Sequence, residues 1–263
     1  MKKGILFVTM LLLISCSTVL LTGRRQFTAI PSSQMLSLSN DSYNEVLSNS
    51  KLSSNQTSIE MVRSVGYKIS DAVEDYLLQN GQSDRIKNFN WEYNVIQSDQ
   101  LNAWCMPGGK IAFYEGIMPV CQDKNGVAVV MAHEVAHAIA RHGNERMSQQ
   151  LAIQLGGMAL AKALEEETET TKNIAMAAFG VGSQVGVMLP YSRTHEKEAD
   201  ELGLYFMAMA GFDPRGSVDF WQRMQEKSGG SPPEFLSTHP HANSRIRNLN
   251  QNMDKALEYY HQN

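Results

Sequence analysis

The spacing of apolar residues predicts a helix and then a group of strands in the first half of the chain. Residues 58–79 carry an apolar residue every three or four positions, which predicts an amphipathic helix ending at Asn80-Gly81. Short strands, rich in aromatic and β-branched residues, are expected at 89–97, 102–106 and 110–114. A small sheet packed on helices follows from this order.

The second half of the pattern is helical. Residues 127–142 are apolar on nearly every face, which predicts a buried helix with a few polar groups at its centre. Two apolar helical stretches lie between residues 151 and 189, and each is shorter than a membrane span, so we expect a packed hairpin. Further helices are expected at 195–210 with Thr194 as its cap, after Asp213-Pro214, and at 243–260. The predicted fold class is α+β, mostly helical, with a small β-sheet.

The first residues have the form of an export signal. Lys2 and Lys3 precede an apolar run that stops at Cys16 and is too short to span a bilayer permanently. Leu13-Ile14-Ser15-Cys16 resembles the lipobox of bacterial lipoproteins, in which the cysteine is acylated. An ordinary cleaved signal with an incidental cysteine is the alternative. The expected organisation is a signal peptide at 1–15, a flexible tether at 16–39 and one catalytic domain at 40–263.

Net charge and cysteine content limit the kinds of partner that we expect for this chain. The net charge is −4 and the basic residues are scattered, so we expect no nucleic acid partner. A lipidated Cys16 would hold the chain on a membrane in the bacterial envelope, and Ser17 after it favours the periplasmic face of the outer membrane. Cys105 and Cys121 then form an even pair, so a disulfide between them is possible.

The candidate chemistry lies in the buried helix. His133-Glu134-Val135-Ala136-His137 is an H-E-x-x-H string, which places both imidazoles on one helical face, where they can hold one metal ion. Glu134 would be the general base beside a metal-bound water. Two hydrogen-bonded core histidines are the structural alternative, which burial of the carboxylate disfavours.

A catalytic zinc needs a third protein ligand and one open position. His142 misses the spacing of the metzincin pattern by one residue, which favours a packing role. Glu196 and Asp200 are four residues apart on a predicted helix, so Glu196 can bind the metal while Asp200 orients a ligand histidine. His195 is the rival ligand, and Glu198 is expected to be a solvated charge. One Zn²⁺ per chain is expected, although the donor set also suits iron or cobalt.

Several motifs in this order resemble the gluzincin family of CAAX prenyl proteases, HtpX heat-shock proteases and Oma-type quality-control peptidases. The motifs are 133–137, 196–200, Asn102-Ala103, Pro107-Gly108-Gly109, Gly116 and Thr238-His239-Pro240.

The resemblance implies a zincin-like catalytic domain with His133, His137 and Glu196 as ligands. It also implies that His239 stabilises the oxyanion and that Arg245 lies near the active centre. From the residues alone, His239 and His241 could be plain loop residues.

The same family accepts extended peptides by edge pairing. The corresponding segment here is the strand at 110–114, with Gly108, Gly109, Lys110, Ile111 and Ala112 as substrate-binding residues. HtpX and the prenyl proteases have membrane-spanning helices, and we expect none here after the signal.

The leading hypothesis is therefore a zinc-dependent endopeptidase that hydrolyses polypeptide substrates, namely unfolded or damaged envelope proteins. One alternative is a chaperone-like, metal-stabilised lipoprotein that binds clients without cutting them. Another is a zymogen in which the hairpin at 151–189 blocks the groove.

Overall fold

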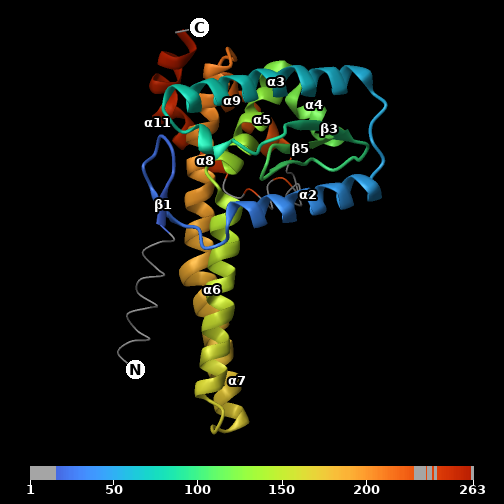
Figure 1. Cartoon of the computed structure of the whole chain (residues 1–263). Helices are drawn as coiled ribbons and strands as arrows, with labels where there is room; N and C mark the ends of the chain where they lie inside the picture. The colour runs from blue at the N-terminus through green and yellow to red at the C-terminus, as the bar shows by residue number, and fades with distance from the viewer. Residues whose placement is uncertain (1–15, 228–234, 236–238, 240–241, 262–263) are drawn as a thin grey trace. The chain divides into compact units, whose positions relative to one another are not determined.

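The computed structural model describes residues 16–227, 235, 239 and 242–261 (Figure 1). The expected signal peptide at 1–15 lies outside these residues, as do Thr238, Pro240 and His241. The chain divides into two compact units. The hairpin unit comprises residues 16–35 and 141–195, and the sheet unit comprises residues 36–140 and 196–261.

The sheet unit contains a mixed three-stranded sheet of β3 (Glu92–Ile96), β4 (Ala103–Met106) and β5 (Lys110–Tyr114). The strand order is β3-β5-β4, with β3 parallel and β4 antiparallel to β5. The turn from β4 to β5 uses Gly108 and Gly109 at φ values of 91° and 82°, which glycine adopts readily. All three strands occur where the sequence predicts them.

The expectation that β5 accepts an extended peptide at its edge is wrong. β5 is the central strand and pairs with a neighbour on each side, so its backbone groups are already used. Lys110 is 6% exposed, and Ile111 and Ala112 are fully buried. The continuous run of buried residues in β5 is typical of a strand whose two faces are both covered. The outer strands are β3 and β4. Ile96 of β3 also forms an isolated bridge with Leu52, whereas β4 has β5 as its one strand partner among the described residues.

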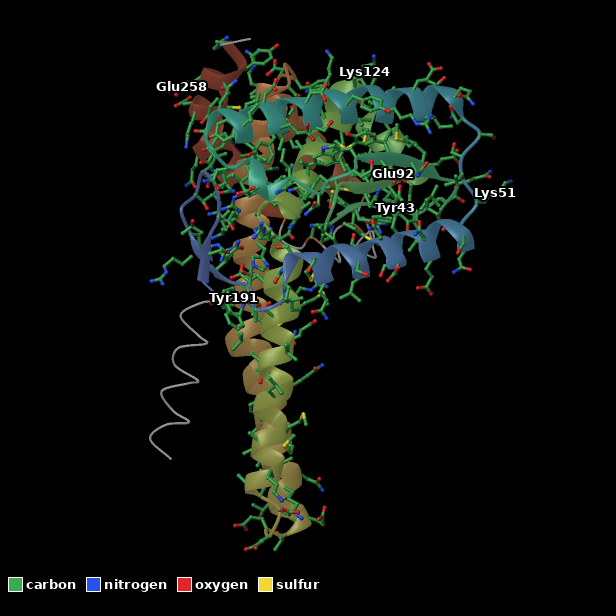
Figure 2. The ribbon with its side chains drawn as sticks, viewed as in Figure 1. Tyr43, Lys51, Glu92, Lys124, Tyr191 and Glu258 are labelled. Carbon is green, nitrogen blue, oxygen red and sulfur yellow. The ribbon has the colours of Figure 1, made fainter. Side chains whose placement is uncertain are left out.

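Helices enclose this sheet. Helix α3 (Gln56–Gln79) begins at Asn55, whose side chain accepts a hydrogen bond from the Ser58 amide at 3.2 Å. Its fully buried residues follow the predicted spacing and are Val62, Val65, Ile69, Val73 and Leu77. Figure 1 shows α3 on one side of the strands and α2 (Ser32–Asn49) on the other. In Figure 2, Tyr43 of α2 points toward the strands, where its hydroxyl accepts a 2.8 Å hydrogen bond from Asn94.

Helix α5 (Lys124–Ile139) is the centre of the sheet unit. It contacts α3, β4 and α9 (Gly216–Glu226), which explains why nearly all of its residues are buried. It ends before the predicted residue 142 because Arg141 has a left-handed backbone with φ of 59°. The other helices and turns of this unit are α11 (Ala242–His261), α4 (Met118–Cys121), η1 (Ser83–Arg85) and η2 (Glu115–Ile117).

The expected flexible tether is instead folded. Strands β1 (Cys16–Thr18) and β2 (Arg25–Phe27) pair antiparallel, and α2 begins at Ser32. Helix α6 (His142–Ala163) supplies partners for this polar segment. The amides of Phe27 and Ala29 donate to Glu145 and Ser148, and Asn144 donates to the carbonyl of Ile30. These partners satisfy backbone groups that a serine- and threonine-rich segment would otherwise leave to water.

In the hairpin unit, α6 is followed by one continuous helical run, Glu169–Met209, which belongs to this unit up to residue 195. The run is made of α7 (Glu169–Ser183), the π-helical turn η3 (Gln184–Met188) and α8 (Leu189–Met209). Thr194 therefore lies inside α8 and does not cap it. Its hydroxyl donates to the Pro190 carbonyl at 3.0 Å. Among the described residues, this run is the one helix that is long and apolar enough to cross a membrane by length and composition, contrary to the sequence expectation.

The expected disulfide is absent from the structure. Cys105 and Cys121 are separate free thiols, and Cys121 is fully buried at the end of α4. Burial raises the pKa of the Cys121 thiol, which keeps it protonated. The predicted fold class, a mostly helical α+β domain with a small sheet, is confirmed.

Candidate metal centre and active site

Helix α5 brings the two histidines of the H-E-x-x-H string together. Their Nε2 atoms are 3.1 Å apart, and the ring centroids are 4.7 Å apart. His133 is 3% exposed, with the rings of Trp221 and Phe235 at 6.3 and 6.4 Å from its own. The two imidazoles therefore point at one spot from successive turns of a buried helix.

Helix α8 adds the carboxylate of Glu196. Its oxygens lie 3.5 Å from His133 Nε2 and 3.4 Å from His137 Nε2. The close approach of α8 to α5 depends on Gly203, a residue that the sequence analysis did not single out. A Cβ at this position would lie 3.0 Å from the backbone of His133, so a larger residue would push the two helices apart.

His239 completes a group of four donors. Its Nδ1 lies 3.3 Å from His133 Nε2 and 3.0 Å from each oxygen of Glu196. The donor atoms of His133, His137, Glu196 and His239 all lie within 4.8 Å of one another. The predicted role of His239 is to stabilise an oxyanion, and the structure brings it among the ligand candidates themselves.

The spacing of the donors fits zinc. A tetrahedral site with bonds of about 2.0–2.1 Å has edges of about 3.3–3.4 Å between its ligand atoms. The distances from His133 Nε2 to the other three donor atoms are 3.1, 3.3 and 3.5 Å. Two or three imidazole nitrogens and one carboxylate are also the donor types that zinc prefers.

The electrostatics of the cluster favour a cation. Burial opposes ionisation of Glu196, but His137 and His239 hold the pKa of its carboxyl well below the ordinary value. Burial and Arg245 lower the pKa of His133, but Asp200 and Glu196 outweigh them and raise it to about 9. The carboxylates thus draw positive charge onto this spot, and a divalent ion supplies it without protonating the ligands.

Glu134 lies beside the cluster without a full set of partners. It is 3% exposed, and burial raises the pKa of its carboxyl. Its Oε1 is buried and has no hydrogen-bond partner within the described part of the chain, and His239 Nε2 lies 3.4 Å from it. A buried carboxylate oxygen of this kind is available to accept a proton from a bound water.

Asp200 and Arg245 contact the candidate ligand residues and hold them in position. Asp200 Oδ1 lies 3.2 Å from His133 Nδ1. The Arg245 guanidinium donates to the same oxygen at 2.7 and 3.0 Å, lies 3.1 Å from a Glu196 oxygen and stacks 3.8 Å above the Trp221 ring. Arg245 is 2% exposed, so it positions the ligand residues rather than facing a substrate.

The rival residues of the sequence analysis lie elsewhere. His195 belongs to the hairpin unit, where its Nε2 is 2.8 Å from Glu145 and its ring stacks on His142 at 4.3 Å. Glu198 is 5% exposed, so the expectation that it is a solvated charge is wrong. The turn of α8 that contains Glu198 is therefore buried on more sides than its pattern of polar and apolar residues predicts.

Comparison with known proteins decides the family. Residues 68–253, which include every candidate ligand, match the model of Peptidase family M48. The chain belongs to peptidase family M48. The M48 metallopeptidases use zinc, and the four-donor cluster could hold such an ion.

Similar proteins carry related names. Mitochondrial metalloendopeptidase OMA1 of Schizosaccharomyces pombe is 30% identical over 90% of this chain and 66% of its own length. The protein of that name from Saccharomyces cerevisiae is 35% identical over 73% of this chain and 54% of its own. A putative beta-barrel assembly-enhancing protease of Vibrio cholerae is 33% identical over 63% of this chain and 34% of its own. The M48 chain thus spans between one third and two thirds of the length of these relatives.

Proposed function

We propose that this M48 chain is a zinc-dependent endopeptidase that hydrolyses unfolded or damaged polypeptides. The observation that carries the proposal is the convergence of His133, His137 and Glu196 beside Glu134, a buried carboxylate with an unpartnered oxygen. The names of the relatives, metalloendopeptidase and protease, agree with this assignment.

The protein groups then have separate tasks. Bound zinc supplies Lewis acidity and lowers the pKa of a water molecule. Glu134 takes a proton from that water and later gives it to the leaving amine, and its burial, which raises its carboxyl pKa, suits this exchange. Asp200 and Arg245 hold the ring of His133 in its orientation.

His239 must move for catalysis in this proposal. A catalytic zinc keeps one position open, whereas a site with four protein donors is closed. His239 belongs to a segment outside both α5 and α8, so it can turn away while the other three donors stay. In this proposal the turn is small enough to leave its Nε2, which lies 3.4 Å from Glu134 before the turn, near the place where an oxyanion would develop.

The substrate backbone would pair with β4. This strand has a free edge among the described residues and is in contact with α5, which carries the ligands. The alternation of hydrogen bonds in an antiparallel ladder turns the backbone groups of Ala103 and Cys105 away from β5. The amide of Ala103 donates to Asn102 Oδ1 at 2.9 Å, so pairing at this edge would use the Ala103 carbonyl and the backbone groups of Cys105. An extended peptide can therefore add to this edge, and such pairing is independent of the side chains of the peptide.

A comparison of two variants tests the proposal. The purified protein is expected to contain about one zinc per chain and to cleave casein. Glu134→Gln should keep the zinc and lose at least about a thousandfold in rate, because only the proton acceptor is removed. Glu165→Gln, at an exposed glutamate, is the matched control and should cleave normally. Cleavage by Glu134→Gln at the normal rate would remove this residue from the mechanism.

We further propose that the chain is a bacterial envelope lipoprotein anchored through Cys16, on the periplasmic face of the outer membrane, and acts on envelope proteins. The lipobox-like sequence supports the anchor, and the name of the Vibrio cholerae relative supports the location. Labelling of cells with radioactive palmitate tests it. The wild type should incorporate label, and Cys16→Ser should not.

A further inference from the structure

We propose that the helical hairpin of α6 and α7–α8 enters the hydrocarbon of a lipid bilayer. Residues 147–161 of α6 and residues 173–192 of the α7–η3–α8 run contain no Asp, Glu, Lys or Arg. We call these two segments the apolar arms. This inference concerns the hairpin unit and is independent of the zinc chemistry.

The apolar side chains of both arms are exposed to an unusual degree. None of the most apolar window of the second arm is buried. Exposed residues of the first arm are Met147, Leu151, Leu155 and Met158, with exposed fractions of 37, 43, 56 and 69%. Those of the second arm are Ile174, Val181, Val185 and Leu189, with 66, 65, 59 and 42%. Each set recurs at helical spacing, so each arm presents a continuous apolar stripe.

The two stripes point in opposite directions. The arms face each other where a Cβ added at Gly156 or Gly157 would lie 3.3 Å from the ring of Phe179. At about 100° per residue, the stripe of each helix lies roughly 180° around from this contact. A flat partner surface would cover only one stripe. An apolar medium on all sides covers both, and this is what the interior of a bilayer provides.

The lengths of the arms suit this environment. The 20 residues at 173–192 span about 30 Å of helix, which equals the hydrocarbon thickness of a typical bilayer. The first arm, with 15 residues, spans about 22 Å, and the long side chains of Arg146 and Lys162 at its ends can extend to the headgroups. Its glutamines lie in the half nearer Arg146, and they are Gln149, Gln150 and Gln154.

Charge is confined to the two ends. The connection between the arms carries Lys162, Glu165, Glu166, Glu167, Glu169 and Lys172. At the other end, Arg146 and Arg193 flank the arms and are exposed, as is Arg25 of the same unit. Exposed Tyr191 lies at that end as well, as Figure 2 shows, and its amphipathic ring suits a membrane interface. Cationic residues beside an apolar segment also favour anionic headgroups.

Site-specific fluorescence tests the proposal. An environment-sensitive dye is attached to a cysteine placed at Met158, Val181 or, as the matched control, Leu78, which is 67% exposed on α3 of the sheet unit. The full chain carries Cys16→Ser and Cys105→Ser, so neither acylation nor a second accessible thiol contributes. Vesicles contain phosphatidylethanolamine and phosphatidylglycerol in a 3:1 ratio. Dyes at 158 and 181 should shift to the blue and be quenched by lipids brominated in their acyl chains, and the dye at 78 should not change.

A second variant separates lipid insertion from other contacts. Val181→Glu with Val185→Glu changes two exposed side chains, so the fold should persist, as circular dichroism can verify. Partitioning of the dye at 158 into vesicles should fall at least tenfold. Dyes at both arm positions that stay accessible to aqueous iodide in the presence of vesicles would overturn the proposal. So would a stable dimer without lipid that is lost in Val181→Glu with Val185→Glu, since a second copy would then cover the stripes.

Discussion

Arg245 connects the candidate metal site to the packed residues around it. Its guanidinium contacts the carboxylates of Asp200 and Glu196 and stacks on Trp221, while being almost completely buried. A planar cation with several donors can satisfy two acidic groups at once, which a lysine could not do in the same geometry. The residue therefore stabilises the fold around the site as well as the orientation of the ligand residues.

Removal of Arg245 should destabilise the sheet unit. Arg245→Ala leaves buried Asp200 without its partner, so we expect a loss of about 3–5 kcal/mol in the free energy of unfolding. Urea titration of the chelator-treated protein, followed by tryptophan fluorescence, measures it. Arg247→Ala, at an exposed position of the same helix, is the control and should change stability by less than about 0.5 kcal/mol. Equal effects of both variants would contradict the structural role.

The ligand residues should differ in their importance for zinc. Glu196→Ala removes one of three proposed ligands and should weaken zinc binding by roughly 100-fold or more. His239→Ala should weaken it by less than about tenfold, because three protein ligands hold a catalytic zinc. Competition with a fluorescent chelator measures both affinities. A loss in His239→Ala as large as that in Glu196→Ala would make His239 a permanent ligand.

At the scale of elements, α8 contributes residues to both the candidate metal centre and the hairpin unit. The part of α8 from residue 196 onward carries Glu196, Asp200 and Gly203 against α5, and the first seven residues of the helix, 189–195, belong to the hairpin unit. The hairpin unit has its own buried charged group. Glu145 is fully buried and bonded to Arg24 at 2.8 and 3.0 Å, with His195 Nε2 at 2.8 Å.

The contribution of Glu145 should depend on pH. Burial opposes its ionisation, but His195 and Arg24 lower the pKa of its carboxyl from 4.5 to about 2. A lowered folded-state pKa gives stability that is present above pH 4.5 and is lost as the pH falls toward 2. We expect at most about 3 kcal/mol from this shift.

Hydrogen exchange of β1 and β2 measures this effect. Glu145→Gln should lower protection at pH 6, and the difference from the wild type should shrink as the pH approaches 3. Glu165→Gln, at the exposed connection of the hairpin, is the control and should match the wild type at every pH. A difference between Glu145→Gln and the wild type that persists at low pH would show that ionisation is not its cause.

At the scale of the whole molecule, a zinc ion held by the candidate donors would join segments that are distant along the chain. His133 and His137 lie on α5, Glu196 lies some 60 positions later, and His239 follows a further 43 positions on. An ion held by all of them is bound only in the folded state. Its binding energy therefore adds to the stability of the sheet unit.

Zinc removal should lower the melting temperature. With free zinc at 1,000 times its dissociation constant, binding adds about 4 kcal/mol, which corresponds to roughly 8–16 °C for a chain of this size. Tryptophan fluorescence follows the sheet unit selectively, because Trp91, Trp104 and Trp221 all belong to it. Glu196→Ala, with its roughly 100-fold weaker zinc binding, should shift on chelation by about a third as much as the wild type or less. A wild type that is insensitive to chelation would contradict a zinc site built from these residues.

Local patterns along the chain were sufficient for the elements of the sheet unit. The helix at 56–79, the three strands and the burial of the H-E-x-x-H helix follow from periodicity, turn residues and capping, all of which act over a few residues. The candidate ligand residues could also be identified from the sequence. The spacing of two histidines on one helix, and of Glu196 and Asp200 on another, fixes which side chains share a helical face.

Only the tertiary structure decided how these elements meet. Strand order made β5 central and left β3 and β4 as the outer strands, which no local pattern specifies, because pairing joins strands across the chain. Packing against α6 ordered the segment after Cys16, and the contact at Gly203 set the approach of α8 to α5. The position of His239 among the ligands likewise arises from long-range packing. The sequence thus determined the local elements and the chemical groups that they carry. The fold determined which of these groups lie next to one another, because that depends on contacts between residues far apart in the chain.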